Sequence, residues 1–230
     1  CCSSPASSWC EQDSGDSHNR SREWGADNEV FKRQLMRNFF TAMMISHGTP
    51  MMLGGDEWMR TQLGNNNAYS TGADNAYNWF RWGLWQADDH RHRMHDFVRQ
   101  MTRWRQSMTH AVAPATYGGG APFSWKSPDN TETVNWDGKA VMLHYYDASA
   151  GPELAILINM ERQNTTFTLP AGRNWHRVVD TQAYFDDNAY LSEEGRDVRQ
   201  THNVDLNAEV ALEATYDAAG SSIVIVQAMP

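Results

Sequence analysis

The sequence predicts an α+β protein in which a helix–strand–loop–helix half precedes an antiparallel β-sandwich. Apolar residues recur at helical spacing in two segments before residue 110. Short β-rich runs separated by turn residues fill the chain after residue 111. The pattern changes near Gly118-Gly119-Gly120, so we expect one domain over 11–110 and a β-sandwich domain over 111–230.

The first predicted helix covers about residues 29–46. Its apolar residues recur every four positions: Phe31, Leu35, Phe39 and Met43. Asn28 can cap its start, and Gly48 and Pro50 end it. A second helix is expected over about 89–108, with an apolar side that includes Phe97, Met101 and Trp104.

A buried strand is predicted between the two helices. The apolar run Met51-Met52-Leu53 is closed by Gly54-Gly55-Asp56-Glu57, which is typical of a strand that ends in a polar rim. A long irregular stretch follows over 58–88 and holds many Asn and Trp residues. One strand with two helices cannot close a sheet, so this half is expected to be the end of something larger.

Six short runs after residue 111 have strand character. They are Ala140–Tyr146, Leu154–Asn159, Gln163–Leu169, Trp175–Asp180, Glu209–Leu212 and Ser222–Gln227. Turn signals such as Asp137-Gly138 and Ala171-Gly172 separate them, which favours an antiparallel sandwich.

Composition excludes several classes of function. The 230 residues carry 19 Lys and Arg against 28 Asp and Glu, a formal charge of −9, and contain no basic run for nucleic acid. No apolar stretch reaches the ~20 residues that cross a bilayer, so a soluble protein without a membrane partner is expected. All three cysteines lie in the first ten residues, which fits a cytoplasmic location. Motifs for serine hydrolases and nucleotide binding are absent.

Aromatic residues make up 11% of the chain and include ten Trp. Such rings combined with amide and carboxylate side chains suit sugars, because a pyranose offers apolar C–H faces and hydroxyl edges. The alternative is that these rings only fill the core.

A resemblance to a known family rests on two motifs. Ser46-His47-Gly48-Thr49-Pro50-Met51-Met52-Leu53-Gly54-Gly55-Asp56-Glu57 and Gly64-Asn65-Asn66-Asn67-Ala68-Tyr69 are similar to segments of the glycogen debranching enzymes and isoamylases, in the α-amylase superfamily of glycoside hydrolases. Asp16-Ser17-His18-Asn19-Arg20-Ser21 and Asn78-Trp79-Phe80 resemble flanking segments of that family. The resemblance is strong over 11–110 and holds only in pattern over 111–230, whereas residues 1–10 have no counterpart and are expected to be mobile.

The resemblance implies a C-terminal portion of such an enzyme. Residues 11–110 would form the last strand and flanking helices of a (β/α) barrel, and 111–230 the terminal β-sandwich. The family's nucleophilic Asp, general-acid Glu and third Asp lie on earlier strands, and this sequence has no counterpart for them. We therefore expect no catalytic residue in this chain, and neither a cofactor nor a metal.

Asp56 and Glu57 leave two interpretations open. One of them, more readily Glu57, could line the substrate cleft or order its loop; alternatively both bond nearby backbone or Arg60. Glycoside hydrolysis needs two carboxyls across one bond, roughly 5 Å apart for retention. Neighbouring residues of an extended strand point to opposite faces, so this pair is not expected to flank one bond.

The loop that follows carries the other candidate substrate-binding residues. Asn66, Asn67 and Tyr69 could bind glucan hydroxyls, with Trp79 as a stacking platform and Trp82 or Trp85 as further candidates. The alternative is a loop packed by its own rings and hydrogen bonds.

Two sets of histidines are interpreted as structural. Asp88, His92, His95 and Asp96 have the spacing of a metal face on a helix, but a solvated helix start is favoured. His47, before a Gly-Thr-Pro turn, is expected to be hydrogen-bonded rather than a base.

Three hypotheses follow for the whole chain. In the first, the chain is part of a debranching hydrolase that acts on α-1,6 branch points in glycogen, starch or limit dextrin, and it is inactive alone. This hypothesis expects a poorly covered apolar face near residues 31–53. The second is a non-catalytic glucan-binding module whose open face is covered in a homo-oligomer. The third is a hydrolase with a rebuilt site that uses Asp56 or Glu57 with another carboxylate such as Asp74.

Overall fold

The computed structural model describes residues 28–63, 65, 68, 74–116, 119–147, 149–183, 203–204, 206 and 211–230. Contacts within the chain define two compact units. Unit 1 comprises Cys1–Lys32 and Met51–Asp96, and unit 2 comprises Arg33–Pro50 and Phe97–Pro230. Residues 1–10 and the first Asn-rich segment lie outside the described residues, and the domain boundary at 110/111 stays a prediction.

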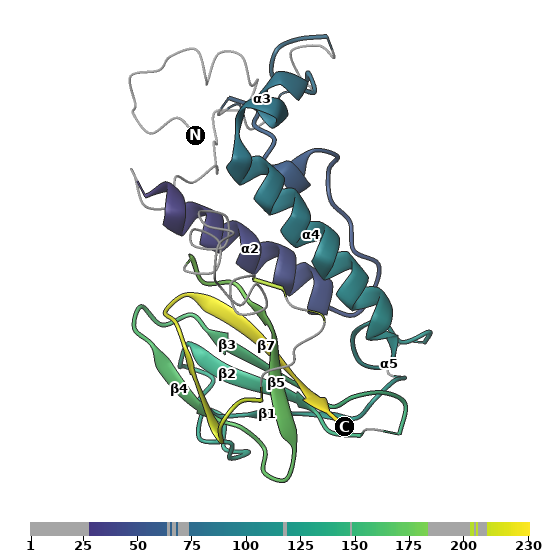
Figure 1. The fold of residues 1–230 in the computed structure, drawn as a ribbon, viewed down its shortest axis with the longest axis vertical. Helices are drawn as coiled ribbons and strands as arrows, with labels where there is room; N and C mark the ends of the chain where they lie inside the picture. The colour runs from purple at the N-terminus through teal and green to yellow at the C-terminus, as the bar shows by residue number, and fades with distance from the viewer. Residues whose placement is uncertain are drawn as a thin grey trace. The chain divides into compact units, whose positions relative to one another are not determined.

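The structure contains both long helices that the sequence predicts. Helix α2 spans Glu29–Ile45 and helix α4 spans Asp89–Ser107, both drawn in Figure 1. The Asn28 side-chain oxygen accepts a 2.9 Å hydrogen bond from the Phe31 backbone N–H, which is the N-cap bond expected for this residue type. A short helix, α3 (Trp82–Ala87), lies within the stretch 58–88, which is therefore less irregular than predicted. Another short helix, α5 (Thr109–Val112), follows α4 in the sequence.

Within the residues that the structure describes, seven antiparallel strands build the β part of unit 2, most of them labelled in Figure 1. The larger sheet has the order β1-β2-β3-β7-β5, and a second sheet pairs β4 with β6. The strands are β1 (Phe123–Lys126), β2 (Ala140–Tyr145), β3 (Leu154–Asn159), β4 (Thr165–Thr168), β5 (Asn174–Asp180), β6 (Thr215–Ala218) and β7 (Ser222–Met229). This arrangement is consistent with the predicted β-sandwich.

The sandwich core lies between the two sheets. Fully buried Met142, Leu157 and Val224 of the larger sheet pack with Phe167 of β4, which is 0% exposed. Alternate residues of β2, β3 and β7 point to this side, as the period of two in a strand requires. The core therefore explains why these three strands were predictable from their apolar runs.

Polar side chains of α2 contact the ends of the larger sheet. Gln34 Nε2 donates to the carbonyl oxygens of Gly220 and Ser221 at 2.9 and 2.7 Å, and Arg37 Nε donates to the carbonyl of Thr181 at 2.9 Å. Gln34 and Arg37 are buried. In contrast, Phe39, a member of the predicted apolar stripe, is 65% exposed.

The predicted strand at 51–57 is wrong for the chain as it stands. Met51–Leu53 has no regular structure, and Asp56–Trp58 forms a short 3₁₀ helix, η1. Met51, Met52 and Leu53 are 90%, 43% and 57% exposed. A strand needs a neighbour for its backbone groups, and within the described ranges no strand pairs with this segment.

Two further differences concern short strands. Strands β1 and β6 were not predicted. Of the predicted strand Glu209–Leu212, Glu209 and Val210 lie outside the described residues, and Ala211 forms a bridge with His176. Each of the missed strands is four residues long, too short for a clear alternation. Across the residues placed in the structure, none of the helices is both long and apolar enough to span a membrane.

Candidate functional site

The segment around Gly55 forms a tight turn in unit 1. Gly55 has φ +100°, and a Cβ atom added there would lie 2.9 Å from Arg60 Cδ and 3.0 Å from Phe80 Cε2. The Gly55 carbonyl accepts hydrogen bonds from the backbone N–H groups of Trp58 and Arg60, at 3.1 and 2.9 Å. Glycine is therefore required by backbone conformation and by close packing at the same position.

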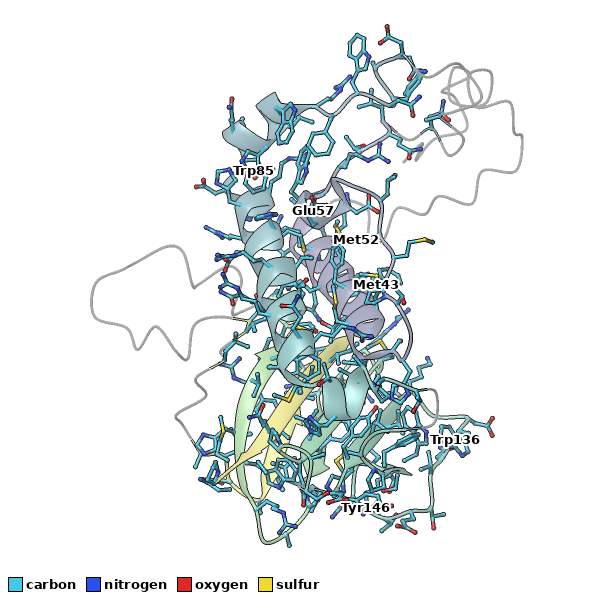
Figure 2. The ribbon with its side chains drawn as sticks, turned by 90° about the vertical axis from the view of Figure 1, so that its right-hand side faces the viewer. Met43, Met52, Glu57, Trp85, Trp136 and Tyr146 are labelled. Atoms are coloured by element: carbon cyan, nitrogen blue, oxygen red, sulfur yellow. The ribbon has the colours of Figure 1, made fainter. Side chains whose placement is uncertain are left out.

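Glu57 folds back onto this turn. Its Oε2 accepts a 2.7 Å hydrogen bond from the Gly55 backbone N–H. This is the bond to nearby backbone that the second interpretation of Glu57 expects, and a role of Glu57 in a substrate cleft stays a prediction. Glu57 is among the side chains labelled in Figure 2.

Asp56 is partly buried beside Glu57 in η1. Burial raises the pKa of this carboxyl above its usual value, while the Arg60 charge and the Leu53 backbone act in the opposite direction. Since the two carboxylates lie in a 3₁₀ turn rather than a strand, the expected opposite-face geometry does not apply. Glu57 is already engaged with backbone, so the pair does not present two free carboxyls.

Trp58 is the centre of an aromatic cluster. It is 3% exposed and contacts three rings: Phe80 edge-on at 5.0 Å, Trp85 edge-on at 6.1 Å and Trp82 stacked at 6.5 Å between centroids. Trp82 is 64% exposed. The cluster holds one Trp in the interior and presents another at the surface.

Arg91 ties the start of α4 to this cluster. Its guanidinium lies 5.7 Å from the Trp58 ring centroid, and its Nη1 donates to the carbonyl oxygens of Trp58 and Met59 at 3.2 and 2.6 Å. Asp88 Oδ2 lies 3.4 Å from Arg91 Nε. Trp58 and Arg91 were not singled out from the sequence; the only signal was the adjacency of Trp58 to Glu57.

Trp79 is an exposed ring with a fixed orientation. Its Nε1–H donates a 2.7 Å hydrogen bond to Asp74 Oδ1, and its side chain is 54% exposed. Asn78 Nδ2 donates to the Ala68 carbonyl at 3.0 Å, which anchors the preceding turn. Trp79 therefore has the exposure that a stacking platform needs, whereas Asp74 is engaged with an indole.

The other loop candidates are only partly covered by the structure. Asn66, Asn67 and Tyr69 lie outside the described residues. Asn65 is 3% exposed, and its backbone exchanges hydrogen bonds with Gln62 at 3.1 and 2.8 Å. Gln62 in turn accepts from Arg60 Nη2 at 2.8 Å. At this point the loop bonds to itself.

The histidines of α4 pack against an aromatic ring. Trp85 lies 4.4 Å from the His92 ring and 4.9 Å from the His95 ring, measured between centroids. The structured part of the chain contains no group of three His, Cys, Asp or Glu side chains arranged to hold a metal ion.

His47, in unit 2, is hydrogen-bonded as expected. Its Nε2 lies 3.0 Å from the Ala111 carbonyl oxygen and 3.3 Å from the Tyr145 hydroxyl.

Comparison with known proteins places these features in a family. Over 167 residues the chain is 31% identical to an isoamylase of Pseudomonas amyloderamosa, which corresponds to 68% of this chain and 21% of that protein. It is 32% identical over 151 residues to a glycogen debranching enzyme of Dickeya chrysanthemi, or 61% of this chain and 20% of that protein. This chain is a partial homologue of the isoamylase and glycogen debranching enzyme family. It spans about a fifth of the length of these relatives.

Solved structures support the fold of this isoamylase-family portion. A pullulanase from Bacillus acidopullulyticus superposes with a TM-score of 0.62 at 18% identity, covering 88% of this chain and 21% of the pullulanase. A GBS pullulanase solved in complex with maltotetraose gives a TM-score of 0.61 at 11% identity, covering 90% of this chain and 29% of that one. A search of family models gave no match.

Proposed function

We propose that the chain is the C-terminal part of a debranching glycoside hydrolase that cleaves α-1,6-glucosidic branch points of glycogen, starch or limit dextrin. The observation that carries the proposal is the exposed apolar run Met51–Leu53, which reaches 90% exposure at Met51 and has no strand partner in the structured part of the chain. Homology to isoamylases and debranching enzymes supplies the reaction class. We place the protein in the cytoplasm.

In this proposal Met51–Leu53 is the last strand of a (β/α) barrel, and α2 and α4 flank it. Strands of a parallel barrel are apolar on both faces because helices cover the outside and side chains fill the inside. Three consecutive apolar residues at the surface are what such a strand would expose when the adjacent barrel strands are not beside it. The exposed Phe39 on α2 fits a helix face that also lacks a partner.

The catalytic carboxylates are proposed to lie on other strands of that barrel. Glu57 is bonded to the Gly55 N–H, and Asp74 accepts from the Trp79 indole, so neither is held free for catalysis. Two carboxyls across one glycosidic bond are needed. This arrangement gives little support to a rebuilt site around Asp56 and Glu57.

The glucan is proposed to contact the loop after η1. Trp79, oriented by Asp74, offers an exposed face for a pyranose ring. Asn66, Asn67 and Tyr69 remain proposed partners for sugar hydroxyls, with Asp56 and Glu57 shaping the rim. The self-bonding of Gln62 with Asn65 gives this loop a fixed base.

A hybrid enzyme tests the proposal. The matching portion of the Pseudomonas amyloderamosa isoamylase is replaced by residues 28–230 of this chain, and reducing ends released from a branched glucan are measured. We expect activity in the hybrid and none in the 230-residue chain alone. A hybrid that folds, as judged by circular dichroism, but releases no reducing ends would contradict the proposal, as would turnover by the chain alone.

The same exposed segment supports a second candidate, a non-catalytic glucan-binding module that forms a homo-oligomer. Burying Met51–Leu53 against a second copy would remove the same apolar surface from water. Sedimentation velocity separates the two candidates, because the second requires a stable dimer that Met51→Asp abolishes. A monomer at all accessible concentrations contradicts it.

A further inference from the structure

Exposed aromatic rings gather at one edge of the β domain. Phe123 and Trp125 lie on the edge strand β1, and Trp136 lies in the loop between β1 and β2. Their side chains are 46%, 38% and 68% exposed. We refer to these three residues as the β1 platform. In Figure 2 Trp136 projects outward from the β domain.

Neighbouring rings of the β1 platform lie close together. Phe123 and Trp125 are two positions apart on one strand, so their side chains lie on the same face about 7 Å apart. The Trp125 and Trp136 centroids are 5.9 Å apart with 71° between their planes. An edge-to-face pair of this kind holds both indoles in defined orientations.

Local hydrogen bonds order two parts of the loop that carries Trp136. At its start, Asp129 Oδ1 accepts hydrogen bonds from the Thr131 N–H at 3.1 Å and the Thr131 hydroxyl at 2.9 Å, and from the Ser127 hydroxyl. These bonds hold the pKa of Asp129 below its usual value. Next to Trp136, Asn135 Oδ1 accepts from the Asp137 N–H at 3.1 Å. An ordered loop thus presents a large indole to solvent.

The surface around Trp136 combines exposed aromatic rings with short polar side chains. In the described segment 119–147, the exposed large apolar side chains are all aromatic: Phe123, Trp125, Trp136 and Tyr146. Exposed Asn135 and Asp137 flank the most exposed ring on both sides, and they offer the donors and acceptors that sugar hydroxyls need. Flat rings beside short polar groups suit a carbohydrate, because its C–H faces stack on rings and its hydroxyls need donors and acceptors.

The 71° between the Trp125 and Trp136 planes is the usual edge-to-face geometry of an aromatic pair. The class of carbohydrate therefore comes from the proposed function, whose substrates glycogen and starch are α-glucans.

We propose that the β1 platform binds an α-1,4-glucan chain at a site separate from the loop of unit 1. The ligand class rests on the proposed function, but the surface and its geometry do not. Such a site would hold an outer chain of a branched glucan and raise the concentration of polymer around the enzyme, an effect of linked binding sites.

The test is affinity electrophoresis of the 230-residue chain in gels that contain glycogen, followed by calorimetric titration with maltoheptaose. Trp136→Ala is expected to weaken binding by about tenfold, and Trp136→Phe much less, because a ring face is retained. Phe39→Ala is the matched control: Phe39 is 65% exposed, close to Trp136 at 68%, but lies on α2. Trp79→Ala reports separately on the unit 1 loop.

Each outcome decides the proposal. Loss of binding in Trp136→Ala with retention in Trp79→Ala and Phe39→Ala supports the β1 platform, whatever the hybrid enzyme does. Loss confined to Trp79→Ala, or no binding by the unaltered chain, overturns it. Equal affinity for cellohexaose overturns the α-glucan assignment. A concentration-dependent dimer that Trp125→Ala dissociates, without glucan binding, would show that the platform pairs two copies of the chain instead.

Discussion

The two units of this chain differ in how far they bury their apolar residues. The β part of unit 2 buries Met142, Leu157 and Phe167 between its two sheets. Unit 1 buries Trp58 within a small aromatic cluster but leaves Met51 at 90% exposure. The difference shows that the same chain buries apolar residues of the β domain while it leaves the apolar run Met51–Leu53 exposed.

The largest effect should come from removing a core ring of unit 2. Phe167→Ala is expected to lower the free energy of unfolding by about 3–5 kcal/mol, because a fully buried ring leaves a cavity. Met51→Ala is the control and should change it by less than ~0.5 kcal/mol, because Met51 is exposed. Urea unfolding followed by far-ultraviolet circular dichroism measures both. Equal effects of the two substitutions would contradict the conclusion that Phe167 is a core residue and Met51 is not.

A buried hydrogen bond in unit 2 should give the next largest effect. The Tyr216 hydroxyl donates to Asp180 Oδ2 at 2.7 Å, and Asp180 is 0% exposed. Tyr216→Phe should lower the free energy of unfolding by about 2 kcal/mol at pH 7, since a buried carboxylate loses a donor.

The effect of Tyr216→Phe should depend on pH. Burial raises the pKa of Asp180 above its unfolded value, and the Tyr216 hydrogen bond partly offsets this. Ionised Asp180 is thus unfavourable in the fold, and stability is regained as the pH falls and the carboxyl protonates. The deficit of the variant should shrink from pH 7 towards pH 5. A deficit that grows on acidification would contradict the assigned cause.

A glycine pair in unit 1 provides a smaller, sharper test. Gly55→Ala should destabilise the turn by about 1–2 kcal/mol, because φ is +100° and the added Cβ approaches Arg60 and Phe80. Gly54→Ala, whose added Cβ meets nothing within 4 Å, is the matched control. Hydrogen exchange of the amides of Trp58 and Arg60 should accelerate only in the first variant. Acceleration in both would mean that the turn is not held by Gly55.

The smallest expected effect concerns Asp56. Burial is the largest influence on its raised pKa, so Asp56→Asn should increase the stability of unit 1 slightly at pH 7, and this gain should shrink as the pH falls and the native carboxyl protonates. Because the residue is only partly buried, the gain should be a few tenths of a kcal/mol at most. A loss of stability at pH 7 would show that the attraction of Arg60 outweighs burial.

Some elements could be predicted because their cause is local. The spacing of Phe31, Leu35 and Phe39 predicted α2, and the apolar runs at 140–146 and 154–159 predicted β2 and β3. The strand expected at 51–57 was wrong because its formation depends on neighbouring strands, which periodicity cannot supply. β1 and β6 were missed because four residues give too little alternation.

The candidate site shows the same division. Exposed Trp79 was found from its Trp- and Asn-rich context, whereas the Glu57 to Gly55 hydrogen bond could not be, since it depends on a left-handed glycine and a 3₁₀ turn. The β1 platform escaped notice because Trp125 and Trp136 are 11 residues apart and meet only when β1 and the loop fold.

The sequence by itself determined the long helices, the antiparallel β domain and the resemblance to debranching enzymes, because periodicity and motif spacing are properties of nearby residues. Tertiary structure decided which side of α2 is buried. Gln34 and Arg37 find carbonyl oxygens of unit 2 there, while Phe39 stays in solvent. Apolar spacing predicts a helix with two different faces, but the residues that pack against the helix in the fold decide which face is buried.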